Sequence, residues 1–310
     1  MVRLLLTVLV VLVAIVAGIV GWVYFGTESG AKRTYDLATA APAIPSDSAS
    51  IERGKHMAHA IAACAFCHGA NLAGQVYMDE QPIARLVPAN LTGGRGGVAA
   101  SMTDEGWVNA IRHGVGRDKQ TLLMMPSEVY QAMADDDLGA LIAYLRSLPP
   151  VDNELPQSQL YPVGRALVAF GQAPFFTAEH VDHDMKPPAT VERGVNAQFG
   201  YYLARMGGCV GCHGNDLAGR RVPGTPEEIP AAANITRTGI GHYKEEDFIR
   251  ALHEGKRPGG APINPFMPLT STAQLTDDEI RAIFAYLRSI PPRDFGQNTS
   301  PHAVPPGSGS

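Results

Sequence analysis

The chain has 310 residues, of which 45% are hydrophobic and 18% are charged, so it holds enough apolar material for packed cores and too little charge for a disordered polyampholyte. Its formal net charge is −5 and no segment concentrates Lys and Arg, which argues against nucleic acid as a partner. The length predicts about two folded units at roughly 150 residues each, and four cysteines are too few for a disulfide-dense scaffold.

The first predicted element is an uncharged apolar run over residues 4–25. As a helix rising about 1.5 Å per residue, it would span about 33 Å, which is enough to cross the hydrocarbon core of a bilayer. Trp22 and Tyr24 stand where an interfacial aromatic belt is expected. We therefore predict a transmembrane anchor over residues 1–27. The alternative is a cleaved signal sequence, whose apolar core is expected to be shorter, at about 7 to 15 residues.

Residues 28–50 follow this run and include a stretch rich in Ala, Pro and Ser, residues 38–50, that has no apolar periodicity. Such a composition predicts a flexible linker. The C-terminal residues 296–310 have the same character, and we predict a disordered tail there.

The rest of the chain repeats itself. CAFCHGANLAGQ begins at Cys64 and matches CVGCHGNDLAGR, which begins at Cys209, 145 residues later. Three further matches follow in the same order at offsets of 144 or 142: Asn90-Leu91-Thr92 with Asn234-Ile235-Thr236, Met125-Pro126 with Met267-Pro268, and LGALIAYLRSLPP from Leu138 with IRAIFAYLRSIPP from Ile280. We therefore predict two homologous domains over residues 51–150 and 191–295, joined by a connection over residues 151–190.

Each copy shows the same order of predicted helices. One helix precedes each cysteine pair, over residues 52–63 in the first copy and 192–206 in the second. Another follows in each copy, where Thr103-Asp104-Glu105 and Glu245-Glu246-Asp247 place acidic residues in its first turn.

The last helix of each copy has the clearest signals. Thr276-Asp277-Asp278-Glu279 has the form of a capping box and precedes apolar residues at helical spacing. Asp135-Asp136-Asp137 marks a helix start in the first copy, and we expect it to cap the helix rather than bind a cation. Pro149-Pro150 and Pro291-Pro292 end the two helices. Strand patterns are scarce, so we predict an all-α fold: two small helical domains with long loops, which need something large to fill their centres.

Both cysteine pairs have the form C-x-x-C-H, the c-type haem attachment signal. The residues are Cys64, Cys67 and His68 in the first copy, and Cys209, Cys212 and His213 in the second. Two thiols about one helical turn apart can each form a thioether with a vinyl group, and the following His can ligate the iron. We therefore predict two covalently attached haem c groups.

Three other chemistries compete for these cysteines. A thioredoxin-like redox pair needs no trailing His, and a zinc site made from all four cysteines would leave both histidines unexplained. Disulfides inside each pair would close small strained loops. The repeated C-x-x-C-H favours haem over all three.

A methionine is the natural sixth iron ligand in a helical shell with a downstream loop. Met124 and Met125 are adjacent candidates in the first copy, and the repeat favours Met125, because Met125-Pro126 matches Met267-Pro268. We predict Met125 and Met267 as the axial ligands, and we expect Met124 to pack against its surroundings.

The remaining histidines lack a repeated register. His56, His59, His113, His242 and His253 are expected to lie on the surface or to neighbour the ligands rather than bind iron. A further two, His180 and His183, fall between the repeats. They could bind a metal weakly, but a solvated linker is the favoured interpretation.

With these motifs the chain resembles class I cytochromes c arranged in tandem, and more closely the multihaem cytochrome c subunits of bacterial membrane-bound alcohol, gluconate and sugar dehydrogenases. The resemblance covers roughly residues 51–295. It lies in CHGANLAG and CHGNDLAG, in NLT and NIT, in TGIGHYKEEDFIRALHEG from Thr238, in both Met-Pro pairs, and in AYLRSLPP and AYLRSIPP. That family typically has three haem domains and often a C-terminal anchor, whereas this chain has two C-x-x-C-H motifs and an N-terminal apolar run.

The resemblance implies that haem is attached on the periplasmic side of the inner membrane. We therefore expect a single-pass membrane protein with two cytochrome-c-like domains in the periplasm. It would carry single electrons from a dehydrogenase or quinol donor towards a terminal acceptor. His and Met would fill both axial positions of each iron, which argues against an enzyme. The expected partners are the membrane and redox proteins such as a dehydrogenase subunit, a soluble cytochrome or a terminal oxidase.

Two alternatives to this function remain open. The chain could be an integral subunit of a dehydrogenase or oxidase complex rather than a free-standing tethered carrier. It could also be a dihaem peroxidase, in which one iron has a displaceable sixth ligand.

Overall fold

The computed structural model of the chain describes residues 1–222 and 225–297, and these fall into two compact units. Unit 1 comprises Met1–Ala41, Ala73–Gln131 and Pro149–Met185. Unit 2 comprises Pro42–Leu72, Ala132–Leu148 and the chain from Lys186 onward. The first sequence repeat contributes to both units, so the predicted domain limits stay a prediction.

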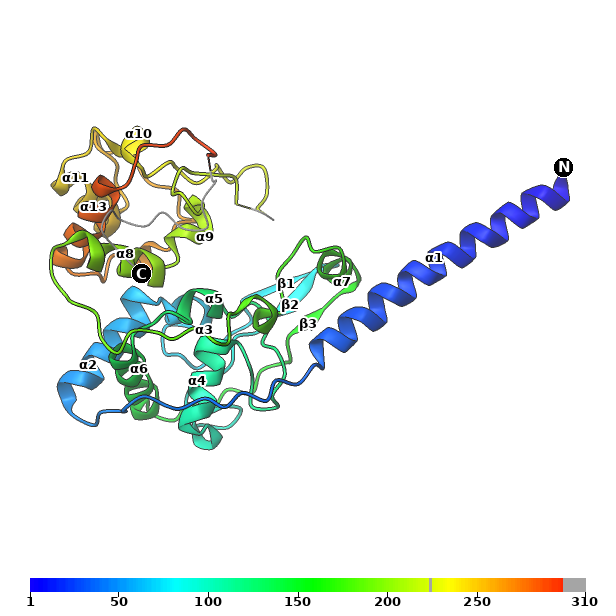
Figure 1. The fold of residues 1–310 in the computed structure, drawn as a ribbon, viewed down its shortest axis with the longest axis horizontal. Helices are drawn as coiled ribbons and strands as arrows, with labels where there is room; N and C mark the ends of the chain where they lie inside the picture. The colour runs from blue at the N-terminus through cyan, green and yellow to red at the C-terminus, as the bar shows by residue number, and fades with distance from the viewer. Residues whose placement is uncertain (223–224, 298–310) are drawn as a thin grey trace. The chain divides into compact units, whose positions relative to one another are not determined.

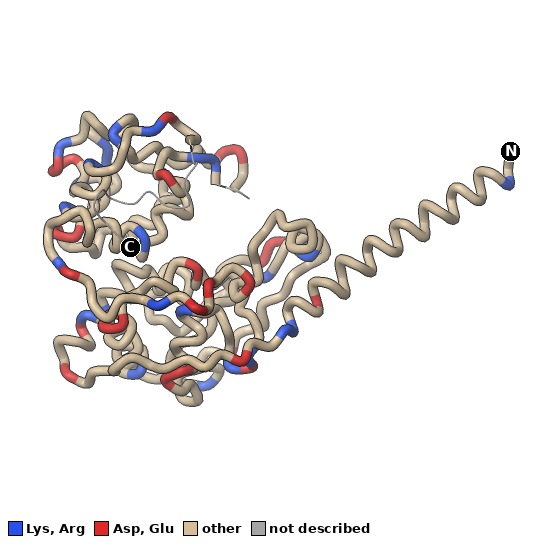
Figure 2. Tube along the Cα trace, viewed as in Figure 1, with Lys and Arg blue, Asp and Glu red and all other residues tan. Residues whose placement is uncertain are grey.

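Helix α1 (Val2–Ala31) contains the apolar run and is long and apolar enough to cross a membrane, with a mean hydropathy of 3.1 over its most apolar window. Charged residues are sparse along it (Figure 2). Its C-terminal end contacts α7 (Pro162–Ala169), where Arg165 donates to the Thr27 hydroxyl at 3.0 Å and to Glu28 at 3.0 Å. A signal sequence near the N-terminus can also form a helix that meets this criterion of length and hydropathy, so the anchor stays a prediction.

Unit 1 also contains a small antiparallel sheet in the order β1-β2-β3 (Figure 1). The strands are β1 (Met78–Glu80), β2 (Ala84–Leu86) and β3 (Gln159–Leu160). Buried Ala84, Leu86, Leu160, Phe175 and Phe176 form the core beneath it. The prediction of a mostly helical fold is confirmed, and this sheet was missed because strands of two or three residues are too short to show a period-two pattern.

The stretch at 38–50, for which the composition predicts a flexible linker, makes specific contacts within each unit. The Thr39 hydroxyl lies 2.8 Å from the side-chain oxygen of Asn109 in unit 1. The Ala43 carbonyl packs so closely on Gly139 in unit 2 that a Cβ there would overlap it. Backbone contacts of this kind leave no signal in composition. The predicted connection 151–190 likewise contains β3 and α7, and residues 298–310 of the predicted tail lie outside the described residues.

The helices of the two repeats begin close to where their capping residues predict. In the first repeat α4 (Asp104–His113) is capped by Thr103. Short elements in the first repeat and its connection are η2 (Ala99–Ser101), α5 (Ser127–Tyr130) and η3 (Thr177–His180). The second repeat contains α10 (Arg237–Ile240), α11 (Glu245–Glu254), α12 (Leu269–Thr272) and α13 (Asp277–Ser289). The predicted capping box of α13 is present, since Thr276 and Glu279 each accept a hydrogen bond from the other's backbone N–H.

One helix begins later than predicted. Helix α8 (Ala197–Met206) starts five residues after Glu192, and the Asn196 side chain caps it by accepting from the Phe199 N–H at 2.9 Å. Gly194 has a φ of +148°, which no right-handed helix can contain. The helix therefore starts after Gly194.

Two equivalent helix crossings form the centre of unit 2. Helix α2 (Ser48–His56) and the π-helix η1 (Met57–Ile61) pack on α6 (Asp135–Ser147), and α8 packs on α13. Each crossing is close because a glycine lies at the contact. A Cβ at Gly54 would overlap the Ala140 carbonyl, and one at Gly200 would overlap the Ala282 carbonyl.

These crossings explain an irregularity in the repeat. Gly200 lies 146 residues after Gly54, whereas Cys209 lies only 145 after Cys64, so the first copy holds one extra residue in between. A π-helix accommodates one additional residue within a helix, and η1 occurs at this place. Both the crossing and the cysteine pair therefore keep their geometry.

The acidic triplet begins α6 as predicted, but it does not cap the helix. The N-cap residue is Ala134, which makes no side-chain cap. Asp137 is buried instead, where it accepts a 2.6 Å hydrogen bond from the Tyr202 hydroxyl and pairs with Arg53 and Arg193. Its role is to join the two repeats within unit 2.

Candidate functional site

The two C-x-x-C-H motifs have the same local structure. Each forms a short helix, α3 (Cys64–His68) or α9 (Cys209–His213). A residue with positive φ precedes each helix, Ala63 at +50° and Gly208 at +68°. The glycines that follow, Gly69 and Gly214, have φ values of +82° and +85°. The motif is therefore presented on the same turn in both repeats.

The structure brings the whole second set of predicted residues together. Cys209, Cys212, His213 and Met267 line one cavity, and all four lie in unit 2. Apolar side chains make up most of its remaining lining, including Ile240, Phe248, Leu252, Ile283 and Leu287. Two thiols, an imidazole and a thioether in an apolar cavity fit a c-type haem, because Cys209 and Cys212 could each bind a vinyl group while His213 and Met267 could bind the iron.

A backbone carbonyl orients the predicted proximal histidine. Nδ1 of His213 lies 2.7 Å from the carbonyl oxygen of Ala233, so Nδ1 carries the proton and Nε2 keeps its lone pair. Burial lowers the pKa of His213, which favours the neutral imidazole that a metal requires. Sequence reasoning missed Ala233, because a residue that acts through its backbone leaves no side-chain signal.

The cysteines are poor candidates for redox or zinc chemistry. No disulfide joins the two cysteines of either pair. Burial raises the pKa of Cys64 to about 12 and that of Cys209 to about 11. Reactive and metal-binding cysteines need the opposite shift, towards the thiolate.

The two Met-Pro pairs also share their local structure. Pro126 and Pro268 are the N-cap residues of α5 and α12. The carbonyl of the preceding Met accepts from the residue after Pro, at 2.8 Å for Met125 and 2.7 Å for Met267. Met124 is 50% exposed and has a φ of +59°, so it packs only partly against its surroundings.

The first set of predicted residues is divided between the units. Cys64, Cys67 and His68 belong to unit 2, whereas Met125 belongs to unit 1. Ligation by His68 and Met125 therefore stays a prediction that rests on the repeat.

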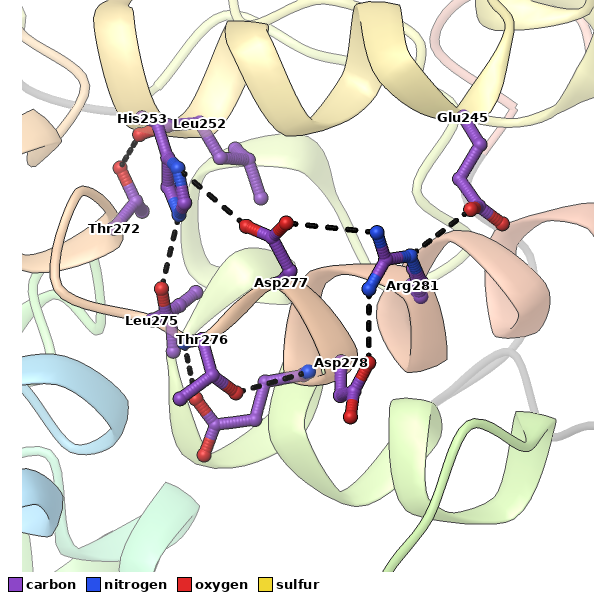
Figure 3. Close-up of polar contacts among 10 residues, drawn as sticks. Glu245, Leu252, His253, Thr272, Leu275, Thr276, Asp277, Asp278 and Arg281 are labelled. Atoms are coloured by element: carbon purple, nitrogen blue, oxygen red, sulfur yellow. Dashed lines mark hydrogen bonds and ion pairs between the residues drawn. The ribbon is translucent and has the colours of Figure 1, made fainter.

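A polar network holds the wall of the second cavity where α11, α12 and α13 meet (Figure 3). The Thr272 hydroxyl donates to the Leu252 carbonyl at 2.8 Å, and Nε2 of His253 bonds the Leu275 carbonyl at 2.9 Å. Leu252, Thr272 and Leu275 all line the cavity. On the outer side, Arg281 joins Glu245 on α11 to the first turn of its own helix. His253 thus has a structural role, because it holds Leu275 in the lining of the second cavity.

The Asn-Leu/Ile-Thr element of each repeat is hydrogen-bonded to the segment that follows the last helix of that repeat. Asn234 accepts from the Thr236 N–H at 2.9 Å and donates to the Arg293 carbonyl at 2.7 Å. In the first repeat Asn90 accepts from the Thr92 N–H at 2.9 Å and donates to the Val151 carbonyl at 2.8 Å. The repeated motif therefore holds the segment after the last helix in place. The sequence showed that the motif recurs but did not indicate this role.

Histidines outside the motifs find protein partners. Nδ1 of His183 lies 3.1 Å from Nδ1 of His113, and its Nε2 bonds the Ala178 carbonyl at 3.1 Å, so His183 is not part of a solvated linker. Nε2 of His59 bonds the Tyr144 hydroxyl at 2.9 Å. Within residues 1–222 and 225–297, no group of three or more His, Cys, Asp or Glu could hold a metal ion.

Comparison with known proteins places this architecture in a family. The family model for cytochrome c matches residues 51–149 and 197–291, and each matched segment contains one C-x-x-C-H motif. The chain belongs to the cytochrome c family. The predicted resemblance is confirmed, and membership implies covalently bound haem c.

Several cytochrome subunits of dehydrogenases are similar to this cytochrome c. The alcohol dehydrogenase (quinone) cytochrome c subunit of Gluconobacter oxydans is 28% identical over 84% of this chain and 58% of its own length. The fructose dehydrogenase cytochrome subunit of Gluconobacter japonicus is 27% identical over 84% and 57%. The gluconate 2-dehydrogenase cytochrome c subunit of Pantoea cypripedii is 28% identical over 80% and 61%. The chain thus spans about three fifths of these relatives, and they give no support to the peroxidase alternative.

Proposed function

We propose that the chain is a dihaem cytochrome c that carries single electrons. The observation that carries this proposal is the second cavity, where His213 and Met267 line one apolar space with both cysteines of α9. The Ala233 carbonyl fixes the proton on Nδ1 of His213 and leaves Nε2 available for iron. A haem bound there would supply a one-electron redox couple, and the chain would set its potential through the axial ligands and burial.

The repeat supports a second haem in the first copy. Positive-φ residues stand before and after α3 as they do around α9, and the carbonyl of Met125 accepts the same hydrogen bond as that of Met267. We infer that Cys64 and Cys67 hold this haem and that His68 and Met125 are its axial ligands. Because both axial positions of each iron would be filled, neither offers a substrate an open site, and electron transfer is the expected activity.

Contacts within unit 2 support transfer between the two haems. Ala60, Ile61 and Ala63 come from the first repeat and line the second cavity. Ala63 is bonded directly to Cys64, which would form a thioether with the first haem. The first haem would therefore be covalently linked to the wall of the second cavity.

We propose a dehydrogenase subunit as the electron donor, since the similar proteins are named as cytochrome subunits of dehydrogenases. Helix α1 would anchor the chain in the inner membrane with both haem domains in the periplasm. A soluble cytochrome or a terminal oxidase would accept the electrons. Lys and Arg are interspersed with Asp and Glu along both units (Figure 2), so docking would depend on a persistent complex or on confinement to the membrane rather than on long-range attraction.

Potentiometric titration of the detergent-solubilised, full-length protein tests this function. We expect two one-electron steps in the haem absorbance and negligible turnover of hydrogen peroxide. A protein without redox-active absorbance, or one that turns over peroxide with an iron lacking its sixth ligand, would overturn the proposal.

A further inference from the structure

The second cavity has one charged side chain that the proposed ligand set does not use. Arg257 lines the cavity, and among the described lining residues it is the only Lys or Arg. The same lining contains no Asp or Glu. A haem carries two carboxylates, and an ionised carboxylate at the edge of an apolar cavity needs a cation or hydrogen-bond donors in place of water. Arg257 is therefore the one cationic partner that this cavity offers.

The backbone of Arg257 is fixed while its side chain is available. Its N–H donates to the Ala261 carbonyl at 2.8 Å, and its carbonyl accepts from the Gly260 N–H at 2.9 Å, which closes a tight turn. The side chain is exposed, and its guanidinium has no hydrogen bond or ion pair with any residue in the described part of the chain. Its five donors can therefore serve a ligand.

Tyr243 lies on the same side of the cavity. It precedes α11 and also lines the cavity. Burial raises the pKa of Tyr243, and the positive charge of Arg257 opposes that rise, as expected of two side chains that lie near each other. A phenol and a guanidinium together offer a neutral and a charged donor to one carboxylate.

The first repeat lacks this cation at the equivalent position. Gly116 closes the same turn there, with its N–H bonded to the Gln120 carbonyl at 2.8 Å and its carbonyl accepting from the Lys119 N–H at 2.9 Å. Arg117, one residue later, donates to the Ser101 hydroxyl at 2.5 Å. The turn that carries Arg257 in the second repeat therefore has glycine at the matching position in the first repeat.

We propose that Arg257 binds a haem carboxylate in the second cavity and thereby raises the reduction potential of that haem. This inference rests on the proposed function. Reduction from Fe³⁺ to Fe²⁺ adds one electron, so a neighbouring cation stabilises the reduced state. At the edge of an apolar cavity this effect is less screened than in water. Because the first repeat has glycine at this position, Arg257 would raise the reduction potential of the second haem without a matching effect on the first.

Titration of Arg257→Gln in the full-length, haem-loaded protein tests the proposal. Lys256→Gln is the matched control, because it removes the same charge from the preceding residue. Lys256 is exposed, pairs with Glu254 at 3.0 Å and does not line the cavity. Met267→His identifies the step that belongs to the second haem, since His/His ligation lowers the potential relative to His/Met.

We expect Arg257→Gln to shift the second-haem equilibrium towards the oxidised form by about tenfold, which is about 59 mV for one electron. Lys256→Gln should leave both steps nearly unchanged. Equal shifts in the two variants, or a shift of the other step, would overturn the proposal. If the untouched protein carries no haem, the proposed function fails instead, so the two failures are distinguishable.

Arg257→His is a second test that can be used if the Arg257→Gln variant does not fold and bind haem. A histidine keeps a positive charge at low pH and loses it near its ordinary pKa of about 6.5. The second-haem potential of this variant should fall more steeply than that of the wild type between about pH 5.5 and about pH 8. The same pH dependence in both proteins would contradict the role of Arg257.

Discussion

Nε2 of His56 lies 2.9 Å from both carboxylate oxygens of Glu279, and this contact joins the two repeats within unit 2. The Tyr202 hydroxyl makes the equivalent contact with Asp137 at 2.6 Å. His56 and Tyr202 occupy the same position relative to the glycine at each helix crossing, and Asp137 and Glu279 are both the third residue of their helices. The same two positions, one in the first helix and one in the last helix of each repeat, therefore make both contacts between the repeats.

The His56 contact makes stability depend on pH. The hydrogen bond that His56 donates to Glu279 raises the pKa of His56, although burial opposes it. Burial alone would raise the pKa of Glu279, but bonds from His56 and the Thr276 backbone lower it overall. The contribution of His56 is full below its unfolded pKa of about 6.5 and is lost as pH rises through the raised folded value. That of Glu279 is present above its unfolded pKa of about 4.3 and is lost as pH falls through the lowered value.

We therefore expect His56→Gln to reduce the free energy of unfolding by about 0.5–1 kcal/mol at about pH 5.5 and by less at about pH 8.5. Urea unfolding followed by circular dichroism at both pH values measures this difference. His180→Gln, at an exposed histidine, is the control for a general effect of losing an imidazole. An equal loss at the two pH values would show that the ion pair does not stabilise the fold.

The glycines at the helix crossings should not tolerate a methyl group. A Cβ at Gly54 or Gly200 would overlap a carbonyl of the facing helix, so Gly54→Ala and Gly200→Ala should each cost about 1–3 kcal/mol despite the better helix propensity of alanine. Gly18→Ala is the matched control, because Gly18 lies within α1 and a Cβ there has no neighbour within 4 Å. Thermal unfolding of the three variants checks this order, and similar stability in all three would contradict the close crossing.

Replacement of the axial methionines should separate the three candidates. Met125→Leu and Met267→Leu should each remove about half of the methionine-to-iron charge-transfer band and lower one reduction potential, since each is predicted to ligate one iron. Met124→Leu should leave the spectrum unchanged, because Met124 is half exposed and the repeat matches Met125 rather than Met124 with Met267. Absorption spectra of the oxidised proteins measure this. Loss of the band in Met124→Leu would reverse the assignment in the first repeat.

Local signals predicted much of this fold. Thr103, Thr276 and Glu279 marked helix starts because capping depends on residues only three apart. The C-x-x-C-H and Met-Pro motifs predicted the cavity residues because the repeat gave each motif two independent occurrences.

Contacts between distant residues could not be predicted in the same way. Asp137 was expected to cap a helix, since nothing nearby in sequence indicates Tyr202 or Arg193 as its partners. His56 showed no repeated register because the extra residue in η1 shifts its offset, and because its counterpart is a tyrosine. Arg257 was not singled out, because its significance comes from the absence of other charges around the cavity.

The number of covalent haems per chain tests the central claim most directly. Haem absorbance in alkaline pyridine, compared with protein concentration, should give two haems per chain that remain attached after acid–acetone extraction and in a denaturing gel. Replacing both cysteines of one motif, Cys64 and Cys67 or Cys209 and Cys212, should leave one. Haem that is absent from the exported wild-type protein, or that is removed by extraction, would contradict the account.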